Sequence, residues 1–310
     1  MHSDDTPKIS VLLCTYNRSL LLSEAVESVL TQTYRDFELV VVNNGSTDGT
    51  AEVLEQYRND KKLRVFNLGE NRGWSGGYNY GLDQLRGEWF ATLADDDVLM
   101  EDALETLIKV PDEVDATVNA VTANCLLKST GELAGLGLDK DQYLDAETSI
   151  TKCSGEFMGM TKMELLGKLR FSEEMSGNEL WYQIDVQARR YYLHKPLKIF
   201  QDQGDTLSNL SKKKNVTLKA KMYKGLVKSV DYWEILREYH PKKYNDKCFK
   251  GWLFLTIHGD KENAAKYSQR LLANHPGIKF KYLYYALGIM GSKPLNVIYR
   301  LCPRKILSAL

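Results

Sequence analysis

Residues 8–45, KISVLLCTYNRSLLLSEAVESVLTQTYRDFELVVVNNG, decide the fold. The segments "KISVLLCTY" (8–16) and "FELVVVNNG" (37–45) are continuous apolar runs, as expected for strands that are buried on both faces. Between them, "LLLSEAVESVLTQT" (20–33) places apolar residues at helical spacing. This order predicts two parallel strands joined by a crossover helix.

The alternation of strand and helix continues to about residue 110. The same reasoning predicts strands at 62–69 and 88–94, helices at 47–57, 78–86 and 100–110, and a Gly-rich turn at 69–77. Further along, we expect a strand within 114–127, a mobile loop at 135–145, a helix at 177–193 and a strand at 196–200. The chain therefore predicts an α/β fold, with a mostly parallel, doubly wound sheet and a C-terminal helical lobe.

Charge is distributed unevenly along a chain whose formal net charge is zero. Residues 1–205 hold 35 Asp and Glu against 20 Lys and Arg, whereas residues 206–310 hold 6 against 21. Such an asymmetry suggests different roles for the two parts. We expect a catalytic domain at 1–205 and a basic helical region at 206–310 that faces an acceptor or an anionic membrane surface. The alternative is a helical lobe that packs on the catalytic domain and uses lysine for solubility.

The composition also indicates where the protein works. No stretch approaches the ~18–20 consecutive apolar residues of a membrane-spanning helix, and the acidic segment 1–8 is not a secretory signal. Five scattered cysteines without metal-ligand spacing suggest reduced thiols. No nucleic-acid recognition motif is present. We expect a cytoplasmic protein that can contact the inner face of the cell membrane, and the sequence leaves its oligomeric state open.

Three adjacent aspartates, Asp95, Asp96 and Asp97, directly follow the predicted strand at 88–94. In parallel α/β sheets, ligands bind outside the carboxyl ends of the strands. Adjacent carboxylates repel one another, and a divalent cation that bridges a substrate diphosphate would offset this repulsion. The alternative is a solvated acidic turn that caps the next helix.

Two more polar motifs fall at the same predicted edge of the sheet. The segment "NNGSTDGT" (43–50) follows the second strand, and "NRGWSGGYN" (71–79) follows the third. Amide and carboxylate groups there could read a base or a ribose, and glycine lets the backbone approach a ligand closely. The alternatives are an Asx turn with a helix N-cap and an ordinary strand-to-helix turn.

Four motifs together resemble the nucleotide-sugar domain of glycosyltransferase family 2, which has the A-type nucleotide-diphospho-sugar transferase fold. They are "VLLCTYNR" (11–18), "VVVNNGSTDGT" (40–50), "NRGWSGGYNYGL" (71–82) and "LADDDV" (93–98). The resemblance covers residues 8–110 closely and 111–205 loosely. It implies a nucleotide-sugar-binding sheet, a UDP-sugar donor with a dTDP-sugar as the alternative, and Mn²⁺ or Mg²⁺ as cofactor.

The resemblance assigns donor-binding roles by position. The base pocket would be lined by Thr15, Tyr16 and Arg18. Arg72 and Gly73 would lie near the ribose or the diphosphate. Asn44 would contact the nucleoside, but many relatives carry an aspartate in its place, so the identity of the base stays open.

The metal motif departs from the family pattern. Many relatives read Asp-x-Asp-Asp, whereas here Ala94 replaces the first aspartate and Asp95 stands one place later. The resemblance implies that Asp97 is a direct metal ligand. Asp95 would be the second residue at the metal and would face the ribose or a metal-bound water. Asp96 would bind the nucleotide sugar together with Asp95.

The general base is the least defined part of the site. An inverting transferase must deprotonate the acceptor hydroxyl, and a carboxylate can do this. Relatives usually carry a Glu-Asp pair at a helix start in the region that matches 177–190, and this chain has none. The candidates are Glu179, which lies nearer the helix start, and Asp185, which could instead support Arg189 one helical turn later.

These observations predict a metal-dependent inverting glycosyltransferase. It would move a sugar from a nucleoside-diphosphate sugar to a hydroxyl of a glycan or lipid-linked acceptor, in bacterial capsule, O-antigen or cell-wall polysaccharide synthesis. One alternative is a nucleotidyltransferase, although "CTYNRS" (14–19) occupies the place of its usual Gly-rich loop. The other is a non-catalytic nucleotide-sugar-binding module, which the missing Glu-Asp pair would explain.

Overall fold

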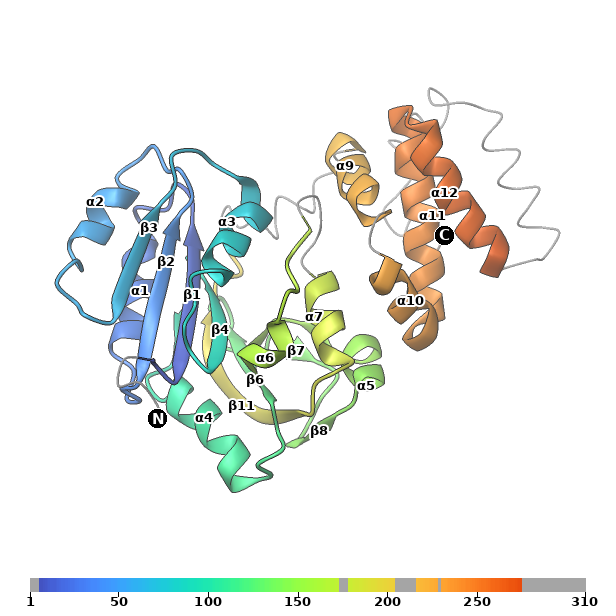
Figure 1. Cartoon of the computed structure of the whole chain (residues 1–310). Helices are drawn as coiled ribbons and strands as arrows, with labels where there is room; N and C mark the ends of the chain where they lie inside the picture. Colours follow the sequence, from blue (N-terminus) through green and yellow to red (C-terminus); the bar gives the residue numbers. More distant parts are fainter. Residues whose placement is uncertain (1–5, 173–177, 204–215, 228–229, 275–310) are drawn as a thin grey trace. The chain divides into compact units, whose positions relative to one another are not determined.

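The structure is a computed structural model of the whole chain (Figure 1). The residues that it describes are 6–172, 178–203, 216–227 and 230–274. The chain forms two compact units. The first comprises Met1–Glu173 and Leu180–Thr206, and the second Glu174–Glu179 and Leu207–Leu310. The assignment of a catalytic domain to 1–205 and of an acceptor- or membrane-facing region to 206–310 stays a prediction.

The first unit is built on a nine-stranded sheet. Its strands are β1 (Ile9–Thr15), β2 (Phe37–Asn43), β3 (Leu63–Asn67), β4 (Trp89–Ala94), β5 (Val98–Leu99), β6 (Ala120–Leu127), β8 (Gln142–Leu144), β10 (Phe157–Lys162) and β11 (Arg190–Phe200). Their order is β3-β2-β1-β4-β10-β6-β11-β5, and β8 also pairs with β11. β10 runs antiparallel to both β4 and β6, so β1–β4, β6 and β11 share one direction. The predicted α/β class and the mostly parallel sheet are confirmed.

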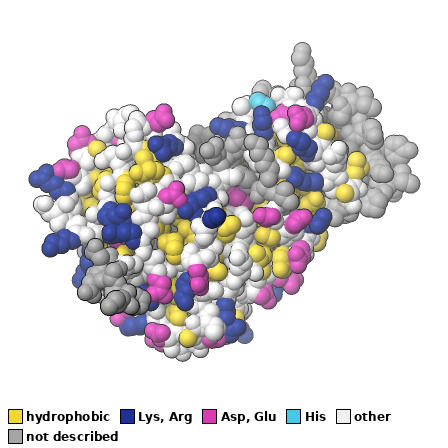
Figure 2. All heavy atoms as spheres, in the orientation of Figure 1, with side chains coloured by type: hydrophobic (Ala, Val, Ile, Leu, Met, Phe, Trp, Pro, Cys, Tyr) yellow, Lys and Arg dark blue, Asp and Glu magenta, His cyan; other side chains and the backbone are white. Residues whose placement is uncertain are grey.

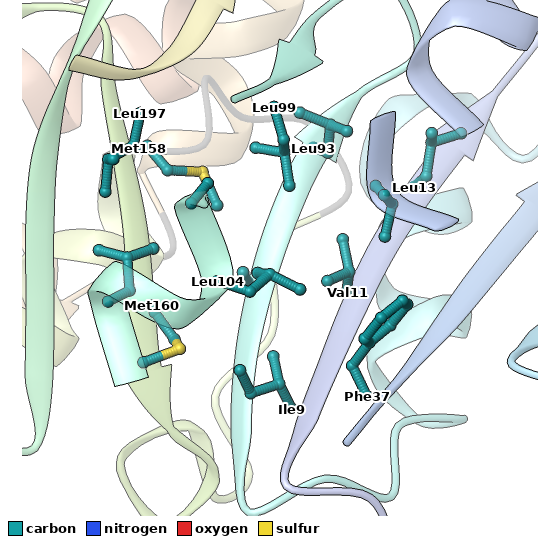
Figure 3. Close-up of a cluster of buried hydrophobic side chains, with 14 of the residues drawn as sticks. Ile9, Val11, Leu13, Phe37, Leu93, Leu99, Leu104, Met158, Met160 and Leu197 are labelled. Carbon is teal, nitrogen blue, oxygen red and sulfur yellow. The ribbon is translucent and has the colours of Figure 1, made fainter. Parts of the chain in front are cut away.

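Helices cover both faces of this sheet (Figure 1). They are α1 (Leu22–Leu30), α2 (Thr50–Glu55), α3 (Gly73–Leu82), α4 (Ala103–Glu113), α5 (Ala146–Thr151), α6 (Met163–Leu166) and α7 (Asn178–Asp185). Successive residues of a strand point to opposite faces. Accordingly, Ile9, Val11 and Leu13 belong to one buried cluster with Leu104 of α4 (Figure 3). Leu12 belongs to another on the opposite face, together with α3 residues.

Three local predictions are wrong. The helix α3 begins at Gly73, inside the predicted turn at 69–77. The predicted loop at 135–145 contains β8 and also β7 (Gly135–Leu136), which pairs with β9 (Ser154–Gly155). The predicted helix at 177–193 ends at Asp185 because "RYYLHKPLKIF" pairs with β6 over its length. Apolar periodicity alone does not separate a buried strand from a helix, and here long-range pairing decides.

The described part of the second unit is helical. It contains α9 (Val216–Leu226), α10 (Val230–Tyr239), α11 (Pro241–His258) and α12 (Lys261–Asn274). α11 ends where Gly259 takes a left-handed conformation, which L side chains rarely adopt. The predicted C-terminal helical lobe is confirmed for these residues. Among the residues described, none of the helices has both the length and the apolar character needed to cross a bilayer.

Candidate functional site

The carboxyl ends of β1, β2 and β4 lie side by side. Thr15 pairs in register with Asn43, and Cys14 pairs with Ala94, so the residues that follow these three strands meet at one edge. Thr15 and Asn44 are buried there. The backbone N–H of Asn44 donates to the Thr15 carbonyl oxygen at 2.9 Å, which fixes the two strand ends together. The structure therefore brings together the strand-end residues that the sequence singled out.

Asn44 holds the loop that leads into α3. Its Nδ2 donates to the Gly73 carbonyl oxygen at 2.9 Å and to Asn71 Oδ1 at 3.2 Å. Its Oδ1 accepts from the backbone N–H of Arg72 at 3.1 Å. These bonds use most of the amide's capacity. A Cβ on Gly77 would lie 2.8 Å from Asn44 Nδ2, so glycine is required there. Base or ribose contact by Asn44 stays a prediction, as do the donor-side roles of Arg72 and Gly73.

The loop after β1 is tied to the loop after β2. Asn17 has a φ of 52°, its Oδ1 accepts from the Thr47 N–H at 2.8 Å, and its N–H donates to Ser46 Oγ at 3.0 Å. Asparagine tolerates this left-handed conformation better than most residues. The turn exposes Tyr16, which is 43% accessible, and directs Arg18 toward the aspartates. Roles for Thr15, Tyr16 and Arg18 in base binding stay predictions.

Asp95 and Asp96 carry perturbed carboxyl groups. Burial, together with the neighbouring Asp96 charge, raises the pKa of Asp95 to about 6. Burial also raises the pKa of Asp96, and repulsion from the Asp97 charge is the second cause. Arg18 opposes both shifts, and its Nε lies 3.9 Å from Asp95 Oδ1. Carboxylates held against their own repulsion favour a cation beside them.

Asp97 has a different environment from its two neighbours. It is 1% accessible, and Lys198 Nζ donates to its Oδ2 at 2.6 Å. The backbone N–H of Gln201 donates to its Oδ1 at 3.0 Å. Direct metal ligation by Asp97 stays a prediction, and both of its oxygens already accept a hydrogen bond.

Lys198 was missed by sequence reasoning. It lies on β11 and is nearly fully buried. Burial lowers the pKa of a lysine, but the Asp97 charge outweighs this effect and holds the pKa of Lys198 above its usual value. Glu156 Oε2 lies 3.9 Å away. The available signal was a single lysine inside the apolar run "PLKIF", where a charge is expected only with a partner.

The candidate base Asp185 is held in an ion pair. Its Oδ1 accepts from Arg190 Nη2 at 2.8 Å, and its Oδ2 accepts from Ser149 Oγ at 2.7 Å. The predicted support of Arg189 by Asp185 is wrong, because Arg189 pairs with Asp115 instead. Arg190 pairs in register with the first residue of β6, at the amino end of that strand. Asp185 is therefore bound at the edge opposite to the aspartate triplet, and its role as a base stays a prediction without geometric support.

The other candidate, Glu179, lies in the first turn of α7 and is 2% accessible. It is grouped with the second compact unit, as is Lys247 of α11. Burial lowers the pKa of Lys247 to about 8, and the Glu179 charge works against this shift. A buried carboxylate at a helix start can exchange a proton with a substrate hydroxyl. Its assignment as the base stays a prediction.

The chemistry of the triplet fits a hard divalent cation. Carboxylate oxygens are the ligands that Mg²⁺ and Mn²⁺ prefer. Among the residues that the structure describes, no three His, Cys, Asp or Glu side chains converge as a complete metal site. Mg²⁺ commonly takes one or two carboxylates and completes its shell with substrate phosphates. Metal binding by Asp95 and nucleotide-sugar contact by Asp96 stay predictions.

Comparison with known proteins gives the family. The model described as "Glycosyl transferase family 2" matches residues 10–131. A curated relative from Campylobacter jejuni, named GalNAc(5)-diNAcBac-PP-undecaprenol beta-1,3-glucosyltransferase, is 31% identical over 302 residues. This match covers 94% of the present chain and 92% of the relative. The likeness thus extends through the C-terminal region and is not confined to the nucleotide-sugar motifs.

Solved structures agree on the fold. The S. aureus TarS 1-349 structure in complex with UDP-GlcNAc has a TM-score of 0.61 at 17% identity and covers 86% of this chain and 89% of its own. The mannosyltransferase PcManGT from Pyrobaculum calidifontis, in complex with GDP-Man and Mn²⁺, has a TM-score of 0.53 at 18% identity and covers 96% and 84%. The sheet, the strand-end motifs and these likenesses lead to one conclusion: the chain belongs to glycosyltransferase family 2 and is an enzyme of the hexosyltransferase type.

Proposed function

We propose that the protein is a metal-dependent inverting glycosyltransferase that moves a hexose from a nucleoside-diphosphate sugar to a hydroxyl of a lipid-linked glycan. The observation that carries this proposal is the pair Asp95 and Asp96, whose pKa values are raised at the edge where β1, β2 and β4 end. Perturbed carboxylates in such a place are typical of functional sites. Family membership favours this reaction over nucleotidyl transfer.

The donor would lie across the ends of β1 and β4. Tyr16 is exposed for contact with the base, and Arg18 Nε lies 3.9 Å from Asp95 Oδ1. A bound Mn²⁺ or Mg²⁺ would neutralise the leaving diphosphate. Asp95 and Asp96 would hold that cation, while the Lys198–Asp97 pair keeps the turn that carries them in place. A UDP-sugar fits the TarS likeness in fold, and a dTDP-sugar is the alternative.

The acceptor is inferred from the relative from Campylobacter jejuni, whose name specifies a glycan on undecaprenyl diphosphate. We propose an acceptor of the same class, used in the assembly of a bacterial surface polysaccharide. The enzyme would then work at the inner face of the cell membrane, with its basic region 206–310 toward the anionic surface. On the face that Figure 2 shows, acidic and basic side chains of the first unit are interspersed.

The reaction requires one proton transfer and one displacement. The acceptor oxygen attacks the anomeric carbon as the bond to the diphosphate oxygen breaks, and the configuration at that carbon inverts. Glu179 would take the hydroxyl proton, and the nucleoside diphosphate would leave with the bonding electrons. A carboxylate that acts as general base contributes on the order of 10²–10⁴-fold to the rate.

The test is transfer to an undecaprenyl-diphosphate-linked oligosaccharide from a panel of UDP-, dTDP- and GDP-hexoses, with Mn²⁺, with Mg²⁺ and with EDTA. We expect turnover with one donor class, loss of turnover in EDTA, and an inverted anomeric configuration of the product by NMR. Glu179→Gln should lose turnover, while Asp185→Asn should keep it per folded molecule. Turnover that persists in EDTA, or a retained configuration, would contradict the proposal.

A further inference from the structure

The second unit contains a cavity that the reaction described above does not use. Its volume is about 450 Å³, and its lining includes Trp233, Glu234 and Arg237 of α10, Tyr244 of α11, and Lys266 and Arg270 of α12. Small-molecule sites in proteins usually have about 300–1,000 Å³. All these residues lie within one compact unit. The cavity is thus a site in its own right, formed by the helical lobe.

Arg270 is the central cation of this cavity. Its Nη2 donates to the Val227 carbonyl oxygen at 3.0 Å, and its guanidinium lies 4.9 Å from the centre of the Trp233 ring. These contacts fix the planar group in one orientation. Within the described part of the chain, its buried Nη1 has no hydrogen-bond partner. A buried charged donor without an acceptor is unfavourable, and it indicates a group that a ligand would complete.

Two more cations stand at the same cavity. Arg237 is exposed and forms no hydrogen bond or ion pair with any described residue. Lys266 Nζ lies 3.0 Å from Glu262 Oε1, at the exposed side of α12. Glu234 is the one carboxylate among the lining residues that the structure describes. Because Glu262 already pairs with Lys266, Arg237 and Arg270 carry the excess positive charge of the cavity, and this excess favours an anion. Glu234 adds an acceptor for a hydroxyl beside it.

We propose that this cavity binds the diphosphate group of a phosphorylated saccharide acceptor. This proposal rests on the proposed function, which supplies the acceptor. Guanidinium groups bind phosphate oxygens in pairs with well-defined geometry. Among the described residues, Arg270 Nη1 and the Arg237 guanidinium have no hydrogen-bond partner. Attraction to a membrane surface would instead be spread over many lysines. Two arginines that line one cavity fit a single anionic group better than a lipid surface.

The experiment measures binding to the full-length protein by isothermal titration calorimetry. The probes are farnesyl diphosphate, uncharged farnesol, and phosphatidylglycerol vesicles, and the Mn²⁺-dependent affinity for the nucleotide-sugar donor is measured in parallel. The variants are Arg237→Gln and Arg270→Gln. The matched control is Lys221→Gln, which removes an exposed cation of α9 outside the cavity lining. Arg237 is exposed, so its variant tests the cavity even if Arg270→Gln disturbs the packing on Trp233.

We expect farnesyl diphosphate to bind the wild type and Lys221→Gln equally, and both arginine variants at least about ten-fold more weakly. Farnesol should not bind, and donor affinity should not change in any variant. Wild-type affinity of Arg237→Gln for farnesyl diphosphate would overturn the proposal. So would a parallel loss of donor affinity, because the diphosphate would then belong to the donor site, or a parallel loss of vesicle binding, because the cations would then form a lipid-facing patch. A protein without sugar transfer but with arginine-dependent diphosphate binding would refute the proposed function alone.

Discussion

The two ends of the parallel sheet treat buried carboxylates in opposite ways. At the amino end, Glu38 accepts from Ser10 Oγ at 2.6 Å and from Arg64 Nη1 at 2.7 Å. Burial would raise the pKa of Glu38, but these hydrogen bonds hold it below its usual value. At the carboxyl end, burial and repulsion from the next aspartate in the chain raise the pKa values of Asp95 and Asp96. At the amino end, hydrogen-bond donors of the chain satisfy the carboxylate. At the carboxyl end, the negative charge of the carboxylates remains available for a bound cation.

The two kinds of carboxylate have opposite effects on the stability of the folded chain. A carboxylate with fixed donors stabilises the folded chain, whereas a carboxylate with a raised pKa destabilises it at neutral pH. Asp97 has fixed donors, as Glu38 has, although it is adjacent to Asp96: Lys198 and the Gln201 N–H donate to its two oxygens. Within the triplet, therefore, Asp97 has fixed hydrogen-bond donors, whereas Asp95 and Asp96 have raised pKa values.

The largest effect is expected for Lys198→Met, which leaves Asp97 buried without its cation. Breaking a buried ion pair from one side costs about 3–5 kcal/mol of unfolding free energy. Urea denaturation should show this loss, and Asp97→Asn in the same chain should recover part of it. Lys195→Met is the matched control, because Lys195 is exposed on the same strand and should cost no more than about 1 kcal/mol. Equal stability of the two variants would contradict the account.

The next effect is on catalysis. Asp95→Asn should lower kcat/KM about 10²–10³-fold, because the leaving diphosphate would lose its charge stabilisation. Asp112→Asn, which changes an exposed aspartate of α4, should leave kcat/KM unchanged. Steady-state kinetics with the cognate donor measure both. Near-normal turnover by Asp95→Asn would place the diphosphate elsewhere.

The third effect concerns pH. The pKa of Asp95 rises from 3.8 to about 6 on folding, so the folded chain holds a proton that the unfolded chain releases. The unfolding free energy should therefore fall by about 3 kcal/mol from this group as the pH rises from about 4 to about 6. Metal-free Asp95→Asn should lack this decrease and exceed the wild type in stability at pH 7. Urea titrations in EDTA at several pH values would show parallel curves for the two proteins if Asp95 were unperturbed.

The smallest effect is expected at the amino end of the sheet. Glu38→Gln weakens the bonds to Ser10 and Arg64 and should cost about 2 kcal/mol of unfolding free energy. Its kcat per folded molecule should equal that of the wild type, because Glu38 lies away from the site. Denaturation and active-site titration test the two parts separately. A selective loss of kcat would remove the distinction between the two ends.

The sequence allowed the sheet and the polar residues at its strand ends to be predicted. The apolar runs of β1, β2 and β4 and the polar residues after them define the sheet and its functional edge, because strand direction fixes where those residues meet. It did not predict Lys198, since the contact with Asp97 depends on the pairing of β11 with β5 and β6. Such register is a long-range property that local periodicity does not carry.

The same limit explains the error at Asp185. A helical spacing suggested Arg189 as its partner, but the helix ends at Asp185 and the following strand places Arg190 there. Glu38 was missed for a related reason. It is one charge inside the apolar run "FELVVV", and only the fold shows that Ser10 and Arg64 surround it.

The proposed reaction depends on a divalent cation that Asp95 and Asp96 hold together with the donor diphosphate. The most direct measurement is Mn²⁺ binding, by electron paramagnetic resonance, in the presence and absence of UDP. We expect UDP to tighten Mn²⁺ binding to the wild type and to Glu38→Gln, and we expect Asp95→Asn to lose this effect. Equal UDP-dependent Mn²⁺ binding by Asp95→Asn and the wild type would contradict it.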